Sequence, residues 1–172
     1  MKKIFLVLFT IMVASLTNDV KAQTLPNPYT GTWEHQNRNQ KFILSIWIDS
    51  NNIMLGHYKM ITVDSNGQQT GTVYNSKKEV HNSGIDWPHA VYFGDMSNGY
   101  TQPFSGPITD NTVNNQRGFI KGLFVFTPNY PLGSTAQWEV KKAQGVREPN
   151  EPDFNIPNNI MLTKVSNSIN LD

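Results

Sequence analysis

Strand-length runs in which hydrophobic and other side chains alternate recur along the chain from residue 30 onwards. In residues 41–49 the hydrophobic positions repeat with a period of two: Phe42, Leu44, Ile46 and Ile48. The opposite face of this run is also largely apolar, so strand parity does not show which face is buried. Runs of this kind predict nine strands: 30–36, 41–49, 53–63, 70–79, 90–95, 100–104, 117–127, 134–142 and 159–165.

Turn residues separate these runs and predict that consecutive strands form hairpins. Residues 49–52 and 64–67 are rich in Asp, Asn, Ser and Gly. Asn66 and Gly67 favour a two-residue hairpin turn of type I′, in which both central residues have positive φ. Residues 97–99 predict a further hairpin.

The spacing of the strands indicates an antiparallel all-β domain. Eight or nine strands in hairpin succession are typical of an up-and-down barrel or a sandwich. After residue 22 the chain has three alanines, whereas Asn, Gly, Thr and aromatic residues are abundant, which disfavours helices. Residues 147–158 contain three prolines and predict an extended strap across the surface before the last strand. We therefore predict an up-and-down barrel of about eight or nine strands with a Pro-rich strap.

Residues 1–22 have the pattern of a secretory signal peptide. Met1–Lys3 is basic, residues 4–14 are apolar, and Val20–Ala22 fits a cleavage site. The apolar run is about eleven residues, which is too short for the roughly twenty that span a bilayer. We predict a signal peptide over 1–22 that is removed, a single barrel domain over 23–165 and a flexible tail over 166–172.

The cysteine content and the net charge limit where the protein can be located and which partners it can bind. The chain has no cysteine, which excludes disulfides, a thiol nucleophile and a lipid anchor. The formal net charge is +1, and without the leader it is about −1, with no basic cluster that would favour nucleic acid. We expect an exported periplasmic or extracellular monomer with no membrane span, no nucleic-acid partner and no lipid anchor.

The sequence contains none of the common catalytic or metal-binding motifs. Neither G-x-S-x-G nor H-E-x-x-H occurs, and the four histidines are scattered. The carboxylates lie mostly at predicted strand ends or turns. We expect a protein without catalytic residues, metal or cofactor. A hydrolase with two carboxylates about 5–10 Å apart in a cleft is the less favoured alternative.

The aromatic residues allow three interpretations. They can fill the barrel core, or some of them can line a cavity for a small apolar ligand. The candidate ligand-binding residues on strands are Trp47, His57, Tyr58, Phe124 and Gln137. A third interpretation is a cell-surface interaction or glycan-binding module with exposed aromatics such as Trp87 and Tyr92.

Two resemblances bear on the fold. Gly31-Thr32-Trp33 resembles the Gly-x-Trp first strand of lipocalin- and avidin-like (calycin) barrels. That resemblance implies that Gly31 and Trp33 form the barrel floor, with Trp33 under a basic side chain of a late strand, for which Lys164 is the candidate. His35 stands where avidins hold a ligand-binding Asn, which argues against biotin as the ligand.

The second resemblance covers most of the chain after the leader. The segments Y-x-G-T-W-E, I-x-L-G-H-Y, Q-W-E and P-N-N-I-M-L-T-K-V are similar to an uncharacterised family of small secreted proteins from Bacteroidota. This resemblance implies the same barrel and secretion, and it implies no activity or functional residue.

Overall fold

The fold is built from antiparallel strands. The computed structural model describes residues 27–77, 90–95, 104–110, 112, 116–125, 131–142 and 153–170, and these residues contain no helix. Their strands are β1 (Gly31–Asn37), β2 (Gln40–Ile48), β3 (Ile53–Val63), β4 (Gln69–Asn75), β5 (Val91–Asp95), β6 (Phe104–Asp110), β7 (Gln116–Val125), β8 (Thr135–Lys142) and β9 (Ile160–Ser166).

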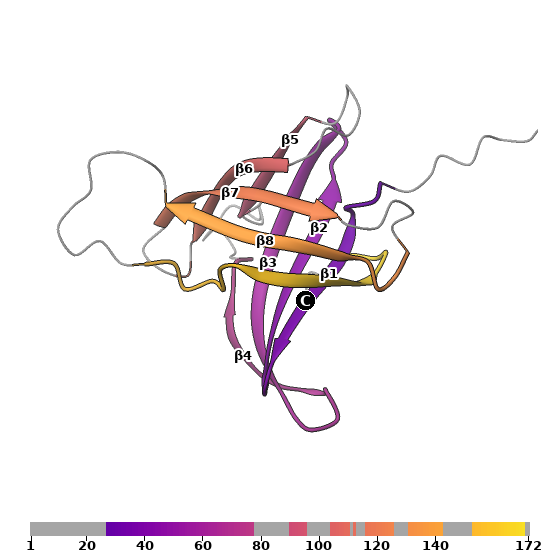
Figure 1. Ribbon diagram of the computed structural model, residues 1–172, viewed down its shortest axis with the longest axis vertical. Coiled ribbons are helices and arrows are strands. Elements are labelled where there is room, and N and C mark those ends of the chain that lie inside the picture. The colour runs from indigo at the N-terminus through magenta and orange to yellow at the C-terminus, as the bar shows by residue number, and fades with distance from the viewer. Residues whose placement is uncertain are drawn as a thin grey trace, which may run out of the picture.

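The strands form an up-and-down barrel, as the sequence predicted (Figure 1). The sheet order is β2-β1-β9-β8-β7-β6-β5-β3-β4, and β2 also pairs with β3. The β2–β3 pairing closes the curved sheet into a ring, and β4 lies outside this ring. All pairings are antiparallel. Each ring strand therefore lies beside its neighbours in sequence, and β9 returns to β1.

Strands β4 and β5 lie on the same edge of β3, one after the other. β4 pairs with residues 59–63 of β3 and β5 pairs with residues 53–56. Between them, the Ser76 N–H donates to Tyr58 O (2.9 Å) and the Ala90 N–H donates to Gly56 O (3.0 Å). Together β4 and β5 are equivalent to one interrupted strand along this edge of β3, and β4 extends the sheet beyond the end of the barrel.

The seam between β5 and β6 has few hydrogen bonds. Val91 opposite Ile108 is its one residue pair in the described part of the chain, supported by a 2.9 Å bond from the Thr109 N–H to Ala90 O. Pro107 lies two residues before Thr109, so its nitrogen faces β5 in the same way, but it has no hydrogen to donate. Residues 100–103 of the predicted strand over 100–104 lie outside the described residues, and β6 occupies Phe104–Asp110 with this proline at the weak seam.

The turn after β3 is a hairpin, but it is not the type I′ turn predicted for Asn66-Gly67. Only Gly67 has positive φ (78°), and its N–H donates to Asp64 O at 3.1 Å. Asp64 Oδ1 accepts from the backbone N–H groups of Asn66 (2.9 Å) and Gln68 (2.8 Å). The aspartate side chain thus stabilises a different turn, which the Asn-Gly pair alone does not reveal.

The barrel interior holds the main hydrophobic core. Its buried members come from seven of the ring strands and from the segments that flank them: Tyr29, Trp33, Phe42, Leu44, Ile46, Met54, Tyr58, Ala90, Val91, Phe93, Ile108, Ala136, Trp138, Val140, Ile156 and Leu162. On β2 and β3 the alternate residues face outward, where Ile43, Ile61 and Val63 form a second, smaller cluster.

The residues after β9 lie against the outer surface of β1–β3. Thr32 Oγ1 donates to Ser168 O (2.7 Å), and Ser45 Oγ donates to Asn170 O (2.6 Å). Lys59 Nζ donates to Asn170 Oδ1 at 2.9 Å. Sequence reasoning ended the barrel at residue 165 and expected a flexible tail. In the structure β9 runs to Ser166, and residues 168–170 form these three contacts with the barrel.

Gly31 allows the close approach of β1 and the end of β9. Its φ is 120°, and a Cβ atom at this position would lie 2.2 Å from Ser166 O. We expect Gly31→Ala to lower the free energy of unfolding by roughly 2 kcal/mol or more, because it adds a backbone clash to conformational strain. Urea denaturation measures the effect.

Gly67→Ala is the matched control for this substitution. Its φ is also positive, but no atom lies within 4 Å of the added Cβ. It should cost only the strain of the left-handed backbone, on the order of 1 kcal/mol. Equal losses for the two variants would contradict the clash at Gly31.

Candidate functional site

One end of the barrel is filled by Trp33 and Lys164. Trp33 is fully buried, and its indole N–H donates to Tyr29 O at 2.8 Å. Lys164 lies opposite Trp33 in the β1–β9 register, with Nζ 5.9 Å from the centre of the indole ring. Nζ also donates to Pro28 O at 3.0 Å, and burial lowers the pKa of this amine. The structure therefore places the Lys164 ammonium over the Trp33 ring, with Gly31 two residues earlier on β1.

The middle of the barrel is packed with aromatic rings. The Phe42 ring centre lies 6.0 Å from that of Tyr58 and 5.8 Å from that of Trp138. Both partners are almost completely buried, and Trp138 Nε1 donates to Pro157 O at 3.0 Å. The described side chains therefore fill the middle of the barrel.

A buried carboxylate fastens the strap to the barrel wall. Asp110 is fully buried, and its Oδ1 accepts from Tyr58 Oη (2.9 Å) and from the Thr112 N–H (3.0 Å). Its Oδ2 accepts from the Asn155 N–H at 2.8 Å. Burial and the nearby Asp110 carboxylate raise the pKa of Tyr74. This network of donors around one carboxylate joins β3, β6 and the strap, so its role is structural.

A pocket opens at the end of the barrel away from Trp33. It has a volume of about 150 Å³ and is lined by His35, Asn37, Gln40, Phe42, Met60, Pro157 and Ile160. The ends of β1 and β2 and the strap before β9 form its wall. Phe42, Met60, Pro157 and Ile160 give it an apolar floor, and the polar groups of His35, Asn37 and Gln40 are available at the rim. We call it the mouth pocket.

The residues predicted to bind ligand do not come together in this pocket. Trp47 and His57 stack on the outer face of β2 and β3, with ring centres 5.2 Å apart and an interplanar angle of 25°. Gln137 also faces outward, and its Nε2 donates to Asn159 Oδ1 at 2.9 Å. Tyr58 points inward but belongs to the packed core. Phe124 is paired with Gln137 in the backbone register, and its side chain lies outside the described residues.

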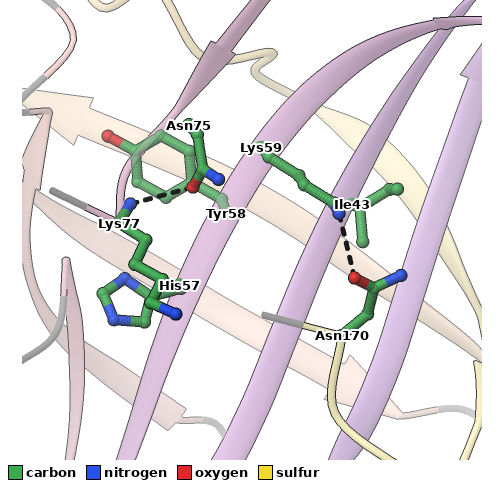
Figure 2. Close-up of a pocket in the computed structure, with 7 residues that line it drawn as sticks. All are labelled: Ile43, His57, Tyr58, Lys59, Asn75, Lys77 and Asn170. Carbon is green, nitrogen blue, oxygen red and sulfur yellow. Dashed lines mark hydrogen bonds between the residues drawn. The ribbon is translucent and has the colours of Figure 1, made fainter. Parts of the chain in front are cut away.

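Figure 2 shows a pocket on the outer side of β2 and β3, next to His57. His57, Lys59 and Lys77 lie around a shallow depression that Asn170 borders from the segment after β9. His57 Nδ1 is 3.2 Å from Ser76 Oγ, and the Lys77 N–H donates to Asn75 Oδ1 at 2.9 Å. The prediction that His57 faces a barrel cavity was therefore wrong, because odd-numbered residues of β3 point outward.

Sequence reasoning missed most of the mouth pocket. His35 was considered only as a departure from the avidin pattern, although it lies two residues after Trp33 and so shares its inward face. That parity is the signal that could have identified His35. The strap residue Pro157 carries no comparable signal, because it reaches the pocket through tertiary packing. Tyr92 of the surface alternative is 36% exposed on β5, and Trp87 lies outside the described residues.

The described part of the chain contains neither a membrane-spanning helix nor a cluster of metal ligands. No helix in this part is long and apolar enough to cross a membrane, and no group of three or more His, Cys, Asp or Glu side chains there could hold a metal ion. No family model, curated protein or solved structure matches the chain.

Proposed function

We propose that this protein is an exported, non-catalytic β-barrel that binds a small apolar ligand in the mouth pocket. The observation that carries the proposal is a pocket of about 150 Å³ with an apolar floor and a polar rim at one end of the barrel. Ligand sites are typically apolar concavities with a few placed polar groups. The Trp33 end and the packed middle leave this end as the place for a ligand.

The size of the pocket limits the ligand to about one ring. An apolar cavity of about 150 Å³ engineered in another protein accommodates benzene. A ligand of seven or eight non-hydrogen atoms can contribute at most about 1.5 kcal/mol per atom, or about 10–12 kcal/mol in all, so its dissociation constant cannot fall below about the nanomolar range. Long fatty acids or polycyclic ligands do not fit this volume.

The proposal is tested by filling the pocket. Toluene added to the wild-type protein should shift methyl resonances of Met60 and Ile160 in NMR spectra, with saturable binding. Ile160→Trp should weaken binding by at least tenfold, because its ring occupies the pocket. Met161→Trp is the matched control, since Met161 is the next residue of β9 and its side chain is 42% exposed on the outer face.

Two results would contradict a ligand site in the mouth pocket. One is the absence of saturable shifts with toluene in the wild-type protein. The other is equal toluene affinity in the wild type and a folded Ile160→Trp variant. Native mass spectrometry of the protein from its own host is the independent test for a natural ligand.

A further inference from the structure

The orientation of the His35 ring defines which of its nitrogens is available to a ligand. His35 Nδ1 lies 3.0 Å from the backbone oxygen of Met161. A carbonyl oxygen can only accept a hydrogen bond, so Nδ1 must carry the hydrogen. In a neutral imidazole the other nitrogen, Nε2, then has a lone pair and acts as an acceptor.

The contact with Met161 also explains why the ring is held in place. The backbone register between β1 and β9 extends to Glu34 opposite Thr163 and no further. Met161 lies two residues beyond that pair, on the side of the mouth, and the His35 side chain reaches its carbonyl. The imidazole therefore continues the β1–β9 hydrogen bonding by one step, with a fixed tautomer, at the rim of the mouth pocket.

No described Asp, Glu, Lys or Arg side chain lines the mouth pocket. Besides the imidazole of His35, Asn37 and Gln40 offer amide groups, and the other lining residues are apolar. The charged neighbours on β1 and β2 are Glu34 and Lys41, which pair with each other at 3.0 Å on the outward side of these strands. A charged ligand would enter an apolar pocket without a lining side chain of fixed opposite charge, which is unfavourable.

We infer that the mouth pocket selects a neutral apolar molecule with one hydrogen-bond donor, such as a phenol or a small aromatic alcohol. The apolar body packs on Phe42, Met60 and Ile160, and the hydroxyl donates to His35 Nε2. This inference rests on the proposed function, because it assigns the ligand class of the same pocket. The inference goes beyond the proposed function in one respect: a ligand that can only accept hydrogen bonds should bind less tightly than one that can donate.

The test compares three ligands of similar shape. Phenol can donate, anisole can only accept and toluene can do neither. We expect the wild-type protein to bind phenol about tenfold more tightly than anisole in NMR titrations, consistent with one hydrogen bond. In His35→Ala this preference should fall to about twofold or less. Gln36→Ala is the matched control, because Gln36 is the exposed neighbour of His35, and it should keep the preference.

A second measurement reads the imidazole directly. Long-range ¹H–¹⁵N spectra of the wild-type protein should show His35 with the hydrogen on Nδ1, and phenol should shift the Nε2 resonance. This result does not depend on the stability of any variant.

The outcomes separate this inference from the proposed function. If toluene binds in the mouth pocket but phenol and anisole bind equally, or anisole binds better, the inference on ligand class is overturned and the pocket remains. A His35 spectrum with the hydrogen on Nε2 would also overturn it. If none of the three ligands binds, the proposed function itself fails.

Discussion

Trp33→Ala is expected to lower the free energy of unfolding by about 3–5 kcal/mol, because it removes a large side chain from the closed end of the barrel. Trp33 is fully buried, donates a hydrogen bond to Tyr29 O and lies beneath Lys164. The truncation would leave a cavity, remove the indole hydrogen bond to Tyr29 O and leave a buried ammonium without its aromatic neighbour. Equilibrium denaturation in urea, followed by circular dichroism, measures the loss.

Trp47→Ala is the control for this large effect. Trp47 lies on the outer face of β2, stacks on His57 and is only partly buried. The same change of side chain should therefore cost clearly less there. A loss below about 1 kcal/mol for Trp33→Ala, or a larger loss for Trp47→Ala, would show that Trp33 does not have the structural role described.

Asp110→Ala is expected to have the second-largest effect, a loss of roughly 3 kcal/mol or more. The substitution removes the carboxylate that accepts from four donors: Tyr58 Oη, the Thr112 N–H and Oγ1, and the Asn155 N–H. Tyr58 Oη keeps a hydrogen bond to Thr109 O at 3.3 Å. Each buried donor left unpaired costs about 1–3 kcal/mol, reduced where water can enter. The strap should also detach from β6, which hydrogen exchange at Asn155 can detect.

Asp110→Asn and Tyr58→Phe measure how much individual hydrogen bonds contribute to the loss of stability in Asp110→Ala. Asp110→Asn keeps one acceptor oxygen and should fall between the wild type and Asp110→Ala. Tyr58→Phe removes a single partner and should cost about 0.5–1.5 kcal/mol. A double-mutant cycle between Tyr58→Phe and Asp110→Ala should show coupling. Additive losses would mean that the two side chains do not stabilise one another.

Most of the fold could be predicted from local patterns. The strand over 53–63 matches β3 at both ends, and the other correctly placed strands differ from the observed ones mainly at their ends. Period-two alternation and turn residues carry this information, since both depend on neighbouring residues. The part of β6 after Phe104 was not predicted, because Pro107 lowers the expectation of a strand. The type of turn at Asp64 was predicted wrongly, because the Asp64 side chain accepts hydrogen bonds from the turn and stabilises a backbone conformation other than type I′.

The candidate site was much less predictable. Trp47 and His57 were predicted to line a cavity because β2 and β3 are apolar on both faces. The outer face of these strands is apolar because residues 168–170 cover part of it. The mouth pocket joins the ends of β1 and β2 to residues 157 and 160, which are far away in sequence. Such a site depends on which distant segments meet, and no spacing motif within one segment encodes it.

The contact between Thr32 and Ser168 joins residues 136 positions apart, and β9 closes the ring against β1 over a similar separation. Local hairpins such as β2–β3 can form early, whereas ring closure must wait for β9, which follows the other described strands in the chain. Long-range closure of this kind slows folding, because loop entropy is lost before the contacts form. Until β9 docks, the exposed edge of β1 can pair with another chain. The last step of folding is therefore the one in which aggregation competes most strongly with the native barrel.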